Sequence, residues 1–238
     1  SACIMSAKTW KMANELLVFQ KSGGDFAKSG KLVLSKSRYI KPKKTKDIPD
    51  RYLKYSLAEN LARDIEIEEG SRVFVLINGT FIAGDFIEAL IVEKNWHVKE
   101  LTVSTLSLSE NNIDSLANLI NGGFVDVLNL VVSDYFYSHE RRNLIPYAYK
   151  ELDKDDKFQL AAAGTHCKLT MIETHCGKKI TIHGSANLRS SSNIEHLCIE
   201  EGAELYNFNM EVQRSILEIH KTINKSVRYE TLWQAVQK

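Results

Sequence analysis

The chain has few cysteines and lacks the long apolar runs that membrane proteins require. Its 4 cysteines among 238 residues show no framework spacing, so we expect free thiols and a reducing compartment. No apolar stretch approaches the roughly 20 residues of a membrane-spanning helix. Near the start, the longest apolar run, Leu16–Phe19, is too short for the core of a signal peptide. These absences predict a cytoplasmic protein with no membrane partner.

Several motifs of nucleotide-binding proteins and hydrolases are also missing. The sequence contains neither a P-loop nor a G-x-G-x-x-G pattern, whose glycines let the backbone cradle phosphates. It also lacks the G-x-S-x-G elbow, which exposes a nucleophilic serine between a strand and a helix. The sequence therefore gives no support to a P-loop, dinucleotide-binding or serine-hydrolase function.

The charge of the chain is strongly asymmetric, although its formal net charge is only +1. Residues 1–56 contain 13 Lys and Arg against 4 Asp and Glu, whereas the remainder is acidic. The eight basic residues between Lys28 and Lys46 have no acidic residue among them. Such a segment suits a polyanion, so we expect nucleic-acid binding by Lys41, Lys43, Lys44 and Lys46. The alternative is a solvated basic face or a mobile arm.

The composition, 44% hydrophobic and 26% charged, is typical of a soluble globular protein. We divide the chain into a basic N-terminal segment, 1–56, and a main domain, 57–238. The first segment would be an arm or a hairpin extension of the same domain. The length allows the main domain a full hydrophobic core.

Strand and helix patterns alternate along the chain. Apolar runs predict strands at 32–40, 73–77, 98–104, 125–132, 157–163, 165–173 and 178–183. Helical spacing and capping residues predict helices from Ile48-Pro49-Asp50 past Leu61, at 81–94, from Ser109 to Gly122-Gly123, and at 139–152, 203–224 and 229–236. This alternation predicts an α/β protein whose central sheet has helices on both faces.

Two short motifs near the end of this pattern carry the functional prediction. His166 and Lys168 lie two apart on one apolar run, and Gly184-Ser185-x-Asn187 ends the next. Because side chains alternate along a strand, we expect His166 and Lys168 to share one face. A hairpin would then present an imidazole, an ammonium, a hydroxyl and a carboxamide to one point. A nucleophile among anion-binding donors suits attack on phosphorus.

These residues resemble the phospholipase D superfamily, whose signature is H-x-K-x4-D followed by G-S-x-N. The match is at His166, Lys168, Gly184, Ser185 and Asn187, with Glu195 downstream where many members carry an acid. Glu173 stands where the signature has aspartate, and ten residues separate it from Gly184 where six are usual. The extra residues fall in the predicted Cys176–Lys178 turn.

The resemblance implies a phospholipase D-like mixed sheet and a phosphodiesterase that forms a phosphohistidine. His166 would attack phosphorus, while Lys168, Asn187 and Ser185 would neutralise the non-bridging oxygens. Glu195 would fix the tautomer of an imidazole. Glu173 and Gly184 would support the site. Neither a metal nor a cofactor is expected.

The chemistry needs a second histidine, which protonates the leaving oxygen and then activates water. Members with a single H-x-K motif pair two subunits, so the resemblance implies a homodimer with one composite site. Together with the basic segment, the resemblance implies a metal-independent nuclease, specifically an endonuclease. DNA, RNA or another phosphodiester is left open as its substrate. The alternatives are a non-catalytic nucleic-acid-binding or scaffold protein, or a lipid phospholipase.

A zinc site is a weaker interpretation of the same region. His166-Cys167 and His175-Cys176 are adjacent pairs, and neighbouring side chains on a strand face apart. We therefore expect Cys167 and Cys198 to be core residues. His175 is expected in a surface turn, and His183 is expected on a strand that lines the pocket.

Overall fold

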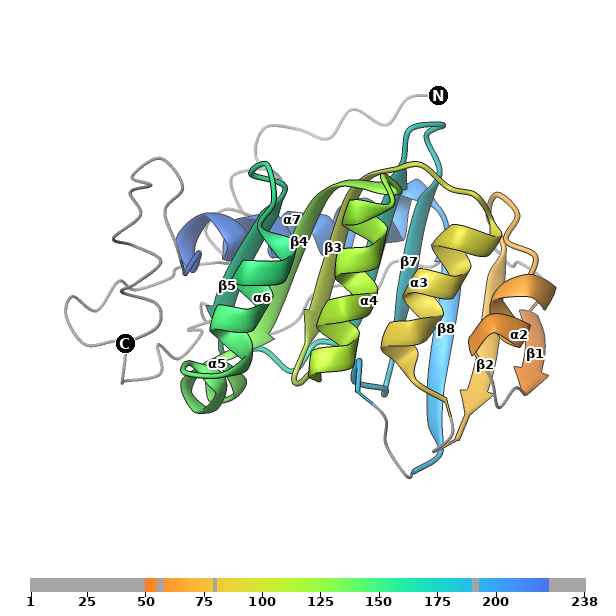
Figure 1. Ribbon diagram of the computed structural model, residues 1–238. Helices are drawn as coiled ribbons and strands as arrows, with labels where there is room; N and C mark the ends of the chain where they lie inside the picture. Colours follow the sequence, from red (N-terminus) through yellow and green to blue (C-terminus); the bar gives the residue numbers. More distant parts are fainter. Residues whose placement is uncertain (1–49, 55–57, 79–80, 190–192, 223–238) are drawn as a thin grey trace, which may run out of the picture. The chain divides into compact units, whose positions relative to one another are not determined.

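The computed structural model describes residues 50–54, 58–78, 81–189 and 193–222 (Figure 1). The chain divides into two units, 1–46 and 47–238, and all described residues belong to the second. The lysines of the basic segment, the strand predicted at 32–40 and the helix predicted at 229–236 lie outside the described residues.

Eight strands form one mixed sheet in the order β1-β2-β8-β7-β6-β3-β4-β5. Their bounds are β1 (Asp50–Lys54), β2 (Arg72–Ile77), β3 (Val98–Thr105), β4 (Val125–Ser133), β5 (Phe158–Ala163), β6 (Leu169–Thr174), β7 (Lys179–Gly184) and β8 (Glu195–Glu201). Strands β1 and β2 are parallel, as are β3, β4 and β5. The central strands β2, β8, β7, β6 and β3 pair antiparallel.

Helices cover both faces of this sheet, as the sequence predicted. They are α2 (Ala58–Asp64), α3 (Ala83–Glu93), α4 (Glu110–Asn121), α5 (Asp134–Glu140), α6 (Leu144–Leu152) and α7 (Ala203–Ile219). Helices α2, α3, α4 and α6 lie side by side on one face, and α7 crosses the other (Figure 1). None of the helices in the described part of the chain has the length and apolarity to span a membrane.

The main hydrophobic core lies between the sheet and the α2–α6 layer. Strand β4 contributes Leu128, Leu130 and Val132, all fully buried, because apolar residues dominate a strand that is covered on both faces. Helix α4 begins with a capping box, in which Ser109 accepts the Asn112 N–H and Asn112 accepts the Ser109 N–H. A second, smaller cluster packs under α7.

One predicted helix start is wrong, and another predicted helix is divided in two. The helix expected from Ile48-Pro49-Asp50 is strand β1, whose backbone pairs with β2, and the helix begins only at Ala58. The leucine spacing wrongly indicated a helix, because the backbone of this segment forms its hydrogen bonds with β2 as an edge strand. The single helix expected at 139–152 is two helices, α5 and α6. Pro146 lies in the first turn of α6, where its missing N–H has no helical partner to lose.

Candidate active site

Both sequence motifs lie at one edge of the sheet, by which we mean the side formed by the ends of the strands and not an outer strand. Strands β3, β4, β5 and β7 end at this edge, and β6 and β8 begin there. Leu169, which follows the H-x-K motif, pairs with Ser104 on one side and with His183 on the other. Gly184, which opens the G-S-x-N motif, pairs with Leu197 of β8. The H-x-K segment therefore enters β6, and the G-S-x-N segment leaves the neighbouring strand β7, at the same level of the sheet.

The H-x-K motif lies in a loop rather than on a strand, which corrects the sequence prediction. Strand β6 begins at Leu169, so residues 165–168 precede it. Since β6 pairs with β3 and not with β5, the chain leaving β5 must cross the ends of β4 and β3 before it enters β6. His166 is exposed in this loop, and Lys168 is half-buried. The Lys168 Nζ donates a hydrogen bond to the His166 carbonyl oxygen, at 3.3 Å.

Two residues at the end of β3 hold the motif loops. The Ser104 hydroxyl donates to the Cys167 carbonyl oxygen at 3.4 Å, within the H-x-K motif. The Thr105 hydroxyl oxygen accepts the Leu188 N–H at 3.4 Å, one residue past the G-S-x-N motif. Sequence analysis missed both residues, because only the strand register places these two small hydroxyls between the motifs.

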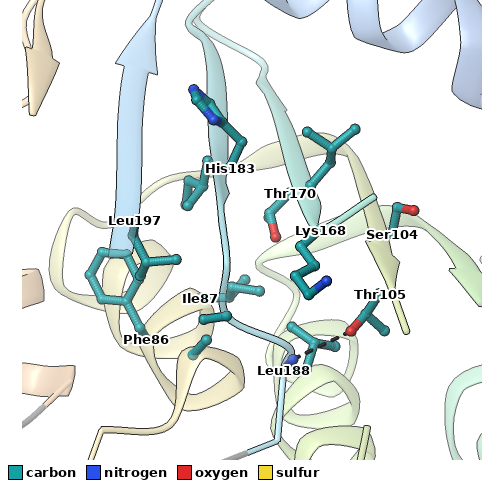
Figure 2. A pocket seen from close by; sticks show the side chains of 13 residues that line it. Phe86, Ile87, Ser104, Thr105, Lys168, Thr170, His183, Leu188 and Leu197 are labelled. Carbon is teal, nitrogen blue, oxygen red and sulfur yellow. Dashed lines mark hydrogen bonds between the residues drawn. The ribbon is translucent and has the colours of Figure 1, made fainter. Parts of the chain in front are cut away.

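A small pocket opens between these loops and α3 (Figure 2). The Lys168 side chain points toward Thr105 and Leu188, whereas the His183 ring on β7 points away from Lys168. Burial lowers the pKa of His183, which favours a neutral imidazole at neutral pH. His183 is among the residues that line this pocket. Lys168 gives the pocket its ammonium group.

Ser185 links the G-S-x-N motif to the acid downstream. Its hydroxyl donates to the Glu195 carboxylate and accepts the His196 N–H at 3.1 Å. Since a hydroxyl has one proton, Ser185 in this arrangement orients Glu195 and does not donate to a phosphate oxygen. Gly184 allows β7 and β8 to approach closely, because a Cβ at this position would lie 2.0 Å from the His196 carbonyl oxygen.

Asn187 and Glu173 complete the predicted set and lie in different places. Asn187 lies between Ala186 and Leu188, which both line the pocket, and its Oδ1 is buried with no hydrogen-bond partner among the described residues. Glu173 lies five residues beyond Lys168 along β6, roughly 17 Å at strand rise. Its carboxylate contacts Lys99 Nζ at 3.4 Å. The structure therefore does not bring Glu173 to the site edge.

The histidines and cysteines of this region are dispersed. Cys198 is buried, as predicted, but Cys167 is exposed, because its loop crosses the sheet edge outside the core. His175 is exposed in the β6–β7 turn, where its Nε2 lies 2.7 Å from Asp126 Oδ2. Across the part of the chain described here, no group of three or more His, Cys, Asp and Glu side chains is arranged to hold a metal ion.

No protein-family model and no curated protein matches this chain. Solved structures do match it. A polyphosphate kinase from Porphyromonas gingivalis is 13% identical, with a TM-score of 0.49, over 78% of this chain and 31% of its own. The phospholipase D family member Nuc from Salmonella typhimurium is 14% identical, with a TM-score of 0.40, over 53% and 83%. NucT from Helicobacter pylori is 15% identical, with a TM-score of 0.45, over 64% and 100%.

One of the matching structures, Nuc, is a phospholipase D family member. The chain spans about a third of the polyphosphate kinase that it matches. Because these identities lie below 25% and these TM-scores below 0.5, the matches carry no inference about what this chain binds or cleaves.

Proposed function

We propose that this protein is a phosphodiesterase of the phospholipase D type that works through a phosphohistidine. The observation that carries the proposal is the convergence of both motif loops at one sheet edge, where the end of β3 holds them. This edge presents an exposed imidazole, His166, and an ammonium group that lines the pocket, Lys168. A nucleophile and a cation in adjacent positions are the minimum that attack on a phosphodiester needs.

The proposed reaction uses the groups in two steps. The neutral His166 attacks phosphorus, forming a P–N bond while the bond from phosphorus to the leaving oxygen breaks. A second histidine protonates that oxygen. The same histidine then takes a proton from water, which displaces His166 and regenerates the enzyme. Lys168 and the Asn187 amide neutralise the non-bridging oxygens, and Ser185 holds Glu195 in place to orient an imidazole.

The substrate that we propose is a nucleic acid, with cleavage independent of a metal. The support is the basic segment from Lys28 to Lys46, whose charges suit a phosphate backbone. Cleavage of an oligonucleotide in EDTA tests this function directly. A specific observation favours one alternative, a non-catalytic binding protein: His166 is exposed and does not line the pocket. Binding without any cleavage would support that alternative.

We further propose that the second histidine comes from a second copy of the chain. Light scattering is expected to give twice the 27.0 kDa of one chain, because a single H-x-K motif supplies one nucleophilic histidine. In a twofold dimer the two His166 side chains would face one pocket. A monomer with full activity, or a dimer with its two His166 residues far apart, would contradict this.

Replacing Lys41, Lys43, Lys44 and Lys46 with Gln is expected to weaken polynucleotide binding similarly for every sequence. Lysine neutralises phosphates as a point charge and does not read base edges as a planar fork does. Removal of one lysine–phosphate interaction should lower the slope of log K against log salt by roughly 0.7 to 0.9. Cleavage of a small nitrophenyl phosphodiester should hardly change. An unchanged salt slope would show that this segment is only a solvated arm.

A further inference from the structure

An exposed aromatic pair lies on α5, at the same sheet edge as the motif loops. Tyr135 is 71% exposed, unusually open for so large an aromatic side chain. Its ring centroid lies 3.9 Å from that of His139, with 33° between the ring planes. The two residues are four positions apart, so they share one face of the helix. The proposed phosphodiester chemistry uses neither of them.

The strand register places this pair beside the H-x-K loop. Ser133, the last residue of β4, pairs with Ala163, the last residue of β5. The chain continues from Ser133 into α5, and from Ala163 into the loop that carries His166. Because paired strands lie about 4.8 Å apart, both segments start at adjacent positions on the same edge. Helix α5 is visible at this end of the sheet (Figure 1).

Helix α5 is fixed in place, so the Tyr135 ring is presented in a defined orientation. The Ser133 hydroxyl accepts the Phe136 N–H at 3.1 Å and donates to the Leu106 carbonyl oxygen at 3.2 Å. Phe136 is buried under the helix. The His139 Nδ1–H donates to the Tyr135 carbonyl oxygen at 2.7 Å, which holds the second ring against the first. A ring held in this way loses little conformational entropy when a ligand stacks on it.

We propose that Tyr135, backed by His139, stacks one base of a single-stranded nucleic acid whose phosphodiester lies at the H-x-K loop. This rests on the proposed nuclease function and narrows its substrate. Every base has a π-face that an exposed aromatic ring can accept. Bases inside a duplex are already stacked on their neighbours. An unpaired strand therefore fits the stacking platform formed by the Tyr135 and His139 rings.

The charges around the platform indicate stacking and not phosphate binding. Residues 134–142 include two acids, Asp134 and Glu140, and two arginines, Arg141 and Arg142. This balance gives the segment no net attraction for a polyanion. The contribution of Tyr135 to the binding affinity should therefore depend on the base and not on the salt concentration. That property separates it from the lysines of the basic segment.

The test is fluorescence anisotropy with a single-stranded oligonucleotide. Tyr135→Ala is expected to weaken binding about 5- to 100-fold, the range for one stacked base, with an unchanged slope of log K against log salt. Tyr135→Phe keeps the ring and should bind as the parent protein does. An abasic oligonucleotide of the same length offers phosphates without bases, so its affinity should not respond to Tyr135→Ala.

The matched control is Phe208→Ala, because Phe208 is an exposed aromatic residue on α7, 44% accessible. The proposal is overturned if Tyr135→Ala weakens binding no more than Phe208→Ala does, if the abasic strand is affected equally, or if the parent protein binds no oligonucleotide. Binding is measured without turnover. A protein that binds through Tyr135 but never cleaves would therefore support the stacking proposal and refute the phosphodiesterase.

Discussion

Replacing His166 with alanine is expected to lower phosphodiester cleavage in EDTA by roughly 10³-fold or more, because the variant has no nucleophile. Lys168→Ala should cost about 10²- to 10³-fold, the range for removing one donor that stabilises developing charge. His166 is exposed and Lys168 only half-buried, so neither change should unfold the protein. Cleavage of an oligonucleotide and of a nitrophenyl phosphodiester measures both effects.

His175→Ala is the matched control for the first of these variants. His175 is an exposed histidine too, but it lies in the β6–β7 turn at the opposite end of β6. Its removal should leave cleavage unchanged. Full activity in folded His166→Ala would refute the phosphohistidine mechanism, and circular dichroism of each variant establishes the folding.

Gly184→Ala is expected to lower the free energy of unfolding by about 3 kcal/mol, the upper part of the range for overpacking. A Cβ at this position would lie 2.0 Å from the His196 carbonyl oxygen. A backbone atom cannot rotate away as a flexible side chain can, so β7 and β8 must separate. That shift would also displace Ser185 from the His196 N–H and weaken its hold on Glu195. Urea denaturation measures the change in stability, and the cleavage assay measures its effect on the site.

Gly202→Ala provides the matched comparison, since Gly202 follows the other end of β8. A Cβ there would meet its nearest atom, Glu200 Oε1, at 3.8 Å, which is an ordinary contact. Its φ of 175° is extended backbone that alanine also adopts. Because Gly202 is the N-cap of α7, its replacement by alanine should lower the free energy of unfolding by at most about 1 kcal/mol. Equal urea midpoints for the two variants would show that the close approach at Gly184 relaxes easily.

Local patterns in the sequence predicted the elements whose stability is largely local. The apolar run of β4 and the N-cap Ser109 of α4 are examples, because burial on both faces and an N-cap each leave a signature in nearby residues. The motif residues themselves were also visible, since their spacing is a property of the chain alone. Where an element depends on a distant partner, as β1 does on β2, the same patterns misled.

The sequence by itself determined the alternating α/β pattern and the candidate nucleophile and cation, His166 and Lys168. Only the tertiary structure decided how they are held. Strand β6 pairs with β3 and not with β5, and this non-local choice turns the expected H-x-K strand into a loop over the sheet edge. The same pairing brings Ser104 against that loop, and the β4–β5 register places the exposed Tyr135 beside it. Such contacts join residues far apart in the chain, so no local pattern encodes them.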